Sequence, residues 1–111
     1  MTGVQTCALP IYLLYYVKEK NIIPKIISEK EEIYIAVNEK IIIGGNKGDT
    51  ISVIPIKGDA EGVTLDNLEY PLKDYYMKYS KPLGISNVML DTSCSISVKK
   101  GILLIIRNKD I

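Results

Sequence analysis

The segment Leu83-Gly-Ile-Ser-Asn87 carries the side chains best suited to bind a small polar ligand. Gly84 lets the backbone approach a ligand closely. Ser86 offers a donor and an acceptor, and Asn87 offers both at fixed geometry. A small heterocycle needs such complementary polar groups beside an apolar wall. Ser and Asn also satisfy backbone groups in ordinary turns, so the residues alone leave both interpretations open.

Other chemistry is poorly supported. Histidine is absent, which removes Ser-His-Asp and Cys-His nucleophilic machinery and any His-based metal site. The loop Gly44–Thr50 fails the phosphate-binding pattern, which requires Gly-Lys-Ser/Thr at its end, and is predicted to be a solvated turn. The charge run Glu29, Lys30, Glu31 and Glu32 is also predicted to be solvated and does not support a Mg²⁺ site. We therefore assign no catalytic and no metal-binding residue to this chain.

Residues 1–11 resemble the translation of a short-read sequencing adapter. A natural tail is one alternative. A signal peptide is another, but no Lys or Arg precedes the apolar run Ala8–Val17 and no small-residue cleavage site follows it. That run is also too short to span a membrane. We exclude residues 1–11 from fold and function reasoning and expect that deleting them leaves thermal stability unchanged.

Composition limits the classes of protein. The chain has 111 residues, with 14 Lys plus Arg and 13 Asp plus Glu, so its net charge is +1. Its length allows one domain, or one small domain plus the remnant of another. No nucleic-acid or membrane partner is indicated. Once the adapter-like segment is excluded, Cys94 is the one remaining cysteine, and a reducing cytoplasm fits. Cys94 is predicted to be a small packed residue rather than a reactive thiol.

The elements change character along the chain. Apolar residues at helical spacing predict the end of a helix at Tyr12–Lys20. A β-rich stretch, Ile22–Ser28, follows it. Short strands separated by turns then predict a β-sandwich or barrel, with a tight hairpin at Lys100-Gly101. The predicted strands are Glu32–Asn38, Lys40–Ile43, Asp49–Lys57, Gly62–Leu65, Leu68–Tyr70, Ser86–Asp91, Ser93–Lys99 and Gly101–Asn108.

The predicted fold class is mainly β, and two units follow from this pattern. Residues 12–43 are expected to be the C-terminal remnant of a truncated α/β domain, and residues 44–111 the β-sandwich. Pro55 within a strand predicts a bulge or an edge position. Four tyrosines near Pro71 and Pro82 could line a pocket or a subunit interface, although strand packing explains each as well: Tyr70, Tyr75, Tyr76 and Tyr79.

Four segments, taken in order and spacing, resemble the C-terminal vitamin-binding domain of bacterial thiamine pyrophosphokinase: Lys47–Ile56, Gly62–Lys73, Leu83–Asn87 and Val98–Ile106. The resemblance extends over roughly residues 12–111. It implies an ATP-dependent transferase that moves diphosphate from ATP to thiamine, giving thiamine diphosphate and AMP. It also implies that a nucleotide-binding α/β domain precedes the β-sandwich. Ser86 and Asn87, and more weakly Gly84 and Ile85, would then belong to the thiamine pocket.

The resemblance also carries expectations about cofactors and partners. Family members hold Mg²⁺ and ATP with acidic residues of the N-terminal domain and with a Gly-Gly-Arg-x-Asp-His motif that this sequence lacks. Mg²⁺ and ATP are therefore expected on a missing N-terminal domain, and this chain by itself is expected to be inactive. A cytoplasmic homodimer is implied. Some members add a Trp against thiamine; here a Tyr or the partner subunit would replace it. The alternative is a non-catalytic β-sandwich binding or interaction module.

Overall fold

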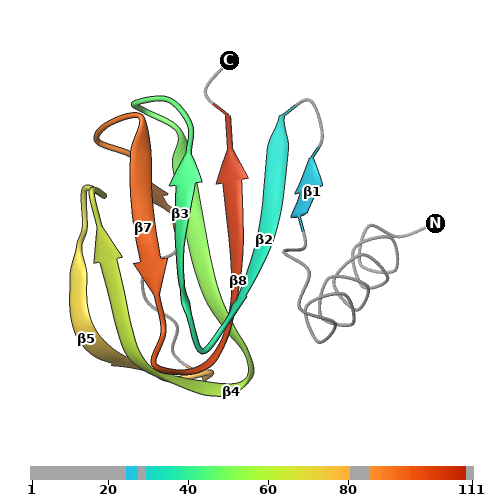
Figure 1. Ribbon diagram of the computed structural model, residues 1–111, viewed down its shortest axis with the longest axis vertical. Helices are drawn as coiled ribbons and strands as arrows, with labels where there is room; N and C mark the ends of the chain where they lie inside the picture. Colours follow the sequence, from blue (N-terminus) through green and yellow to red (C-terminus); the bar gives the residue numbers. More distant parts are fainter. Residues whose placement is uncertain (1–24, 28–29, 81–85, 110–111) are drawn as a thin grey trace.

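The computed structural model describes residues 25–27, 30–80 and 86–109, and every regular element among them is a β-strand (Figure 1). The helix predicted at Tyr12–Lys20 and the adapter-like residues 1–11 lie outside these ranges. The strands are β1 (Lys25–Ile27), β2 (Glu31–Val37), β3 (Lys40–Gly44), β4 (Thr50–Asp66), β5 (Leu72–Met77), β6 (Asn87–Val88), β7 (Ser93–Ser97) and β8 (Lys100–Asn108).

The strands form two antiparallel layers that share one long strand. One layer has the order β1-β2-β8-β4, with β6 also paired to the start of β4. The other contains β3-β7-β4, with β5 also paired to β4. In Figure 1, β4 descends beside β8, turns at the bottom of the view and rises beside β5. The predicted mainly β, sandwich-like fold is confirmed.

Strand β4 joins the layers because it is interrupted by a bulge. Its first half alternates regularly, with Ile51, Val53 and Pro55 buried. The register against β8 then shifts between Ile56 and Glu61, where Lys57 and Gly58 have positive φ angles of 60° and 112°. Bulges of this kind bend a strand and increase its twist. The second half of β4 therefore leaves β8 and pairs with β5 and β7.

The core lies between the two layers. Inward positions along each strand are apolar, as the period of two requires. On β8 the inward residues include Leu103 and Ile105, which lie opposite Ala36 and Tyr34 of β2. The buried core residues are Tyr34, Ala36, Ile43, Ile51, Val53, Ala60, Val63, Leu65, Leu68, Met77, Met89, Cys94, Ile96, Val98, Leu103 and Ile105. Cys94 thus has the packed role predicted for it.

Residues outside this core explain why β8 is almost continuously hydrophobic. Ile35 and Leu104 are paired in register across β2 and β8, and both are buried although neither belongs to the core cluster. Alternation directs them to the opposite face of the sheet from Tyr34 and Leu103. This layer is therefore apolar on both faces, which is typical of a sheet that is covered on both sides.

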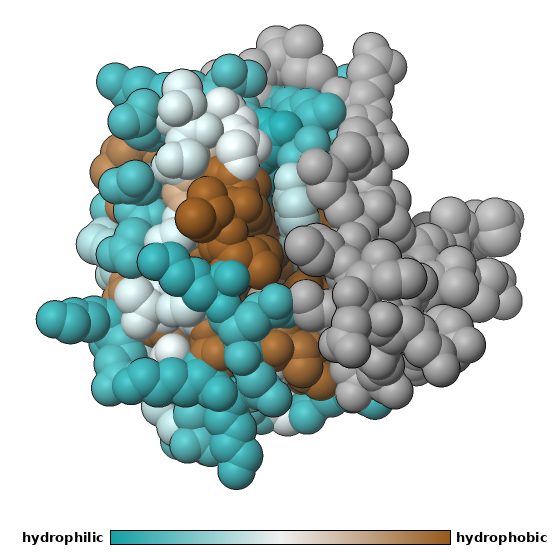
Figure 2. Space-filling view, in the orientation of Figure 1, coloured by the Kyte–Doolittle hydropathy of each residue, from teal (hydrophilic) through white to brown (hydrophobic). Residues whose placement is uncertain are grey.

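One edge of the second layer exposes apolar surface. In Figure 2, hydrophobic atoms gather in the middle of the face that carries β3. Ile42 of β3 is 72% exposed, whereas the next residue, Ile43, is 1% exposed and belongs to the core. Adjacent residues of β3 thus point to opposite faces, and the register places one isoleucine in solvent.

Two sequence predictions about local elements differ from the structure. Lys100-Gly101 does not form a hairpin, since β7 and β8 belong to different layers and pair with other strands. Gly101 is needed there because its φ is 134° and an added Cβ would lie 2.8 Å from the Ala60 Cα. Leu68–Tyr70 forms only an isolated bridge, Leu68 to Met89, and the strand in this region is β5.

The sheet pairing also bears on the expected domain boundary. Strands β2 and β3 lie in the segment assigned from sequence to an α/β remnant, residues 12–43. In the structure β2 pairs with β8 along its whole length, and β3 pairs with β7. The described residues therefore group Glu31–Gly44 with the strands that follow.

Candidate ligand-binding site

The predicted ligand-binding residues lie beside the start of β4. Strand β6 pairs there through Thr50 with Val88 and Ile51 with Asn87. Ser86 immediately precedes β6 and is exposed, whereas Asn87 is only 1% exposed. Gly84 and Ile85, the weaker predictions, lie outside the described residues. The structure thus brings an exposed hydroxyl next to a buried amide at the end of one sheet.

The Asn87 side chain fastens β6 to a neighbouring segment. Its Oδ1 accepts hydrogen bonds from the backbone N–H of Tyr70 at 2.8 Å and of Val88 at 3.0 Å. Its Nδ2 donates to the Tyr70 carbonyl at 2.7 Å. The Glu69 N–H donates to the Val88 carbonyl at 2.9 Å. Asn87 therefore ties β6 to the backbone of Tyr70.

Ser86 has a backbone conformation that serine rarely adopts. Its φ is 62°, in the left-handed region. Among the described residues, the other non-glycine residues with positive φ include Asn38, Asn67 and Asp74. Asn and Asp adopt this backbone region more readily than most residues. Residues held in sparsely populated conformations concentrate at functional sites, where surrounding contacts enforce them. Ser86 is exposed and directly precedes Asn87, whose side chain bonds to Tyr70 and Val88.

The four tyrosines do not form one cluster. Tyr70 is 63% exposed and its backbone is held by Asn87. Tyr75 packs partly against the core. Tyr76 and Tyr79 are gathered instead around Asp59, which accepts from the Tyr76 hydroxyl and the Tyr79 N–H at 2.8 Å each. Tyr70 is therefore the tyrosine tied directly to the candidate site.

These hydrogen bonds change the pKa values of Asp59 and Tyr76. The Tyr79 N–H, followed by the Tyr76 hydroxyl, lowers the pKa of the Asp59 carboxyl because both donate to its ionised form. The same contact with Asp59 raises the pKa of Tyr76. These two contacts join the bulged part of β4 to β5 and to Tyr79.

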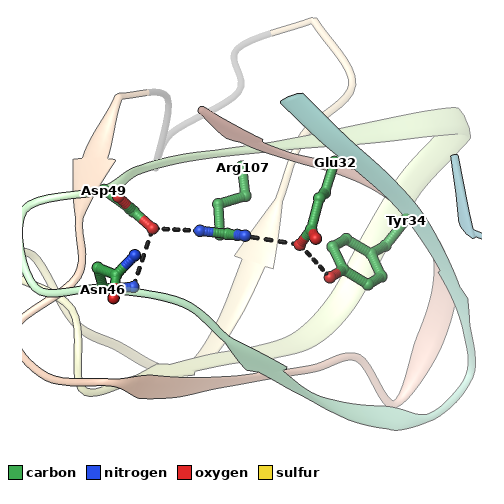
Figure 3. A network of polar contacts seen from close by, with 5 residues as sticks. All are labelled: Glu32, Tyr34, Asn46, Asp49 and Arg107. Atoms are coloured by element: carbon green, nitrogen blue, oxygen red, sulfur yellow. Dashed lines mark hydrogen bonds and ion pairs between the residues drawn. The ribbon is translucent and has the colours of Figure 1, made fainter. Parts of the chain in front are cut away.

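A chain of buried polar contacts lies between the layers (Figure 3). Arg107 of β8 donates from Nε to Glu32 Oε1 at 3.0 Å and from Nη1 to Asp49 Oδ2. Glu32 also accepts from the Tyr34 hydroxyl at 2.5 Å. Asp49 accepts from the Asn46 N–H at 2.9 Å and is 0% exposed. The network therefore connects β2, β8 and the loop before β4.

The strand register explains these contacts. Arg107 lies directly opposite Glu32 on β2 and opposite Ile51 on β4. Glu32 and Tyr34 are two residues apart, so they share the inward face of β2. The prediction that Glu32 belongs to a solvated charge run is wrong, because strand alternation turns this carboxylate inward onto Arg107.

Protonation in the network follows from burial and from charge. Burial first, and then the contact with Glu32, raise the pKa of Tyr34, so the phenol stays neutral. The hydrogen bond to Glu32 is the largest cause that raises the pKa of Arg107. Burial also raises the pKa of the Cys94 thiol to about 11. At neutral pH Arg107 therefore stays a guanidinium ion and Tyr34 a neutral phenol.

Residues 25–27, 30–80 and 86–109 contain no group of three or more His, Cys, Asp or Glu that could hold a metal ion. Over those same ranges, no helix combines the length and apolarity needed to cross a bilayer.

Fold and site together define a two-layer β domain with an ordered polar loop at one end of a sheet. Residues 30–103 match the family described as "Thiamin pyrophosphokinase, vitamin B1 binding domain". The chain belongs to this family of vitamin-binding domains. The match begins before β2, in agreement with the sheet pairing, and it includes both Ser86 and Asn87.

Known proteins support the same assignment. The chain is 37% identical over 60 residues to thiamine pyrophosphokinase from Bacillus subtilis, which is 54% of this chain and 28% of that protein. The crystal structure of the Bacillus subtilis enzyme superposes with a TM-score of 0.87 at 29% identity and covers 100% of this chain. The Geobacillus thermodenitrificans structure gives 0.82 at 20% identity over 99% of this chain, which shows the fold alone.

This chain is shorter than the solved proteins that it matches. This chain spans 53% of the Bacillus subtilis structure and 51% of the Geobacillus one. It is therefore about half as long as the solved relatives that it matches.

Sequence reasoning missed Arg107 and Asp49 as a structural pair. A signal for Arg107 was present, because it is the single arginine of the chain and shares the inward phase of Leu103 and Ile105. Arginine suits buried ion pairs better than lysine. The pairing with Asp49 could not be predicted, since it depends on which strands are neighbours.

Proposed function

We propose that this chain supplies the thiamine-binding part of a thiamine pyrophosphokinase, which transfers diphosphate from ATP to the hydroxyethyl arm of thiamine. The products are thiamine diphosphate and AMP. The observation that carries the proposal is the family match over residues 30–103, which spans the candidate site. The 37% identity to the Bacillus subtilis enzyme over 60 residues supports the same substrate.

Within this proposal, Ser86 and Asn87 contact the aminopyrimidine of thiamine. The Ser86 hydroxyl is exposed and can donate or accept. Asn87 contributes the amide hydrogen that does not bond to Tyr70, and its three hydrogen bonds keep the loop ordered before thiamine arrives. Gly84 and Ile85 complete this segment. Preorganisation of this kind reduces the entropy lost on binding.

The chemical step is assigned to the other half of the longer protein. ATP and Mg²⁺ would be held by acidic residues of a preceding α/β domain, and we assign no described carboxylate to them. Two copies would form a homodimer in the cytoplasm, with thiamine between the β-sandwich of one subunit and the catalytic domain of the other. Phosphoryl transfer depends on metal ions and positioned phosphates, so the present chain by itself is expected to form no thiamine diphosphate.

Ser86→Ala tests the proposed site most cleanly. In the longer protein, with the preceding domain restored from its gene, the variant should bind thiamine about ten- to a hundredfold more weakly. ATP affinity should be unchanged. Calorimetric titration measures both affinities. Ser93→Ala is the matched control, because Ser93 is also exposed but begins β7. Normal thiamine binding by Ser86→Ala would remove Ser86 from the site.

Two further variants separate binding from folding. Ser86→Gly removes the hydroxyl and relieves the positive φ, so it should lose thiamine affinity without losing stability. Asn87→Ala is less informative because it also breaks the contacts with Tyr70 and Val88. If the longer protein bound thiamine but formed no thiamine diphosphate from ATP, a non-catalytic binding module would replace the enzyme as the better explanation.

A further inference from the structure

We propose that the ion pair between Arg107 and Asp49 is a positioning device for the Ser86–Asn87 segment. Its meaning for ligand binding rests on the proposed function above. The geometric claim is narrower and can be tested without a ligand: this pair, rather than core stability in general, holds β6 in place.

The first observation is a continuous set of contacts from Arg107 to β6. The Asp49 carboxylate accepts from Arg107, and the Asp49 carbonyl accepts from the Met89 N–H at 2.8 Å. The neighbouring Gly48 N–H donates to the Met89 carbonyl at 3.0 Å. Met89 immediately follows β6. One residue, Asp49, thus joins the buried cation to the strand that carries Asn87.

The second observation is that the loop before β4 closes tightly on the same carboxylate. Asp49 Oδ2 accepts from the Asn46 N–H at 2.9 Å, and the Asp49 N–H donates to the Asn46 carbonyl at 3.0 Å. These reciprocal bonds fix the turn that delivers Asp49. The side chain therefore has little freedom to follow Arg107 or Met89 if either one moves.

The third observation is the close packing around Gly45. An added Cβ there would lie 2.8 Å from Arg107 Nη1, 2.9 Å from Asp49 Oδ2 and 3.0 Å from Met89 Sδ. Gly45 is thus in contact with both members of the ion pair and with the residue after β6. Only a glycine leaves room for all three groups to meet.

Glu32 provides a control within the same network. It contacts the same Arg107, is 8% exposed, and lies on β2. Its carboxylate bonds to Arg107 and to the Tyr34 hydroxyl, which lies on the same strand, β2. Neutralising Glu32 should therefore disturb the core without selectively releasing Asn87.

The experiment compares Asp49→Asn with Glu32→Gln in the full chain. Amide hydrogen exchange is followed by NMR at Gly48, Met89 and Tyr70, with the amides of the β2–β8 ladder as the internal reference. Asp49→Asn should accelerate exchange at the three positions by about ten- to a hundredfold relative to the ladder. Glu32→Gln should change the exchange rates of the three amides and of the ladder amides by the same factor.

Gly45→Ala keeps the proposal testable if Asp49→Asn does not fold. The extra methyl group separates Arg107, Asp49 and Met89 without removing a charge, so it should accelerate the same amides selectively. Equal acceleration of the three amides and the ladder in both Asp49→Asn and Gly45→Ala would overturn the proposal and leave the pair as a core-stabilising contact.

Thiamine titration of the same variants separates this proposal from the proposed function. If Asp49→Asn accelerates exchange selectively at the three amides, it should also weaken thiamine binding. Glu32→Gln should weaken thiamine binding less. If the longer protein with its preceding domain restored shows no response to thiamine, the proposed function fails, while the exchange pattern still decides whether the pair positions β6.

Discussion

Arg107 is enclosed by carboxylates at a point where a hydrophobic side chain would otherwise complete the core. Its partners Glu32 and Asp49 are 8% and 0% exposed, so all three charges are removed from water. Desolvation of such a network costs free energy that the internal contacts largely offset. Its value therefore lies in geometry, because it holds the loop before β4 against the paired strands β2 and β8.

Breaking this network on one side should be strongly destabilising. Arg107→Met leaves two buried carboxylates without their cation, and we expect a loss of about 3–5 kcal/mol in the free energy of unfolding. Urea unfolding followed by circular dichroism measures it. Lys100→Met, which removes an exposed cation from the same strand, should stay within about 0.5 kcal/mol. Equal effects of the two substitutions would contradict the buried position of Arg107.

Cys94 leads to a prediction about pH. Its pKa is raised from 9.0 to about 11 because burial disfavours the thiolate. The folded state thus holds the proton more tightly than the unfolded state. This contribution to stability is complete below the ordinary pKa and is lost as pH rises from about 9 towards 11.

The free energy of unfolding of the parent chain should therefore decline in that alkaline range. The free energy of unfolding of Cys94→Ala should decline less steeply. Tyr34 has a raised pKa too and adds a loss of the same sign at higher pH. At neutral pH, iodoacetamide should modify Cys94 only on unfolding, with peptide mapping to separate it from Cys7. Rapid modification of the folded chain would show that the thiol is accessible.

At the residue scale, local patterns were a partial guide. Cys94 could be placed in the core because it lies in an alternating run. Ser86 and Asn87 could be singled out as a pair, but their difference in burial could not, because it depends on the distant Tyr70. Glu32 was misjudged because three neighbouring charges conceal the strand phase that turns one of them inward.

At the scale of elements, β3 offers a direct check of register. Ile42 and Ile43 are neighbours with the same side chain, yet they are 72% and 1% exposed. We expect Ile43→Ala to cost about 2–5 kcal/mol of stability through cavity formation. Ile42→Ala should stay within about 0.5 kcal/mol. Thermal and urea unfolding of the two variants, compared side by side, measure the difference; a reversed order would mean that β3 is shifted by one residue.

Strands were more predictable than their connections. Alternation located β2, β3, β7 and β8 within a few residues. It divided β4 in two, because the bulge around Lys57 and Gly58 looks in sequence like a turn between strands. It also suggested a hairpin at Gly101, where a positive φ serves a crossover between layers instead. Turn residues mark a change of backbone direction, but the partner of each strand is a long-range property.

At the scale of the whole molecule, the fold explains how a short chain keeps an ordered loop. Strand β4 contributes to both layers, so the two layers cannot slide apart without breaking it. The start of β4 also carries β6, the Asp49 loop and the contacts with Arg107. The candidate site is therefore attached to the strand on which both layers depend.

The central claim, that this domain binds thiamine through the Ser86–Asn87 segment, is tested most directly by an NMR titration of the chain with thiamine. The method detects weak binding, which is expected if a second domain completes the pocket. We expect the amide shifts of Ser86, Asn87, Val88 and Tyr70 to move with thiamine concentration, while those of Tyr76 and Tyr79 around Asp59 stay still. Ser86→Ala should reduce the movement. Shifts that centre elsewhere, or no shifts at saturating thiamine, would contradict the claim.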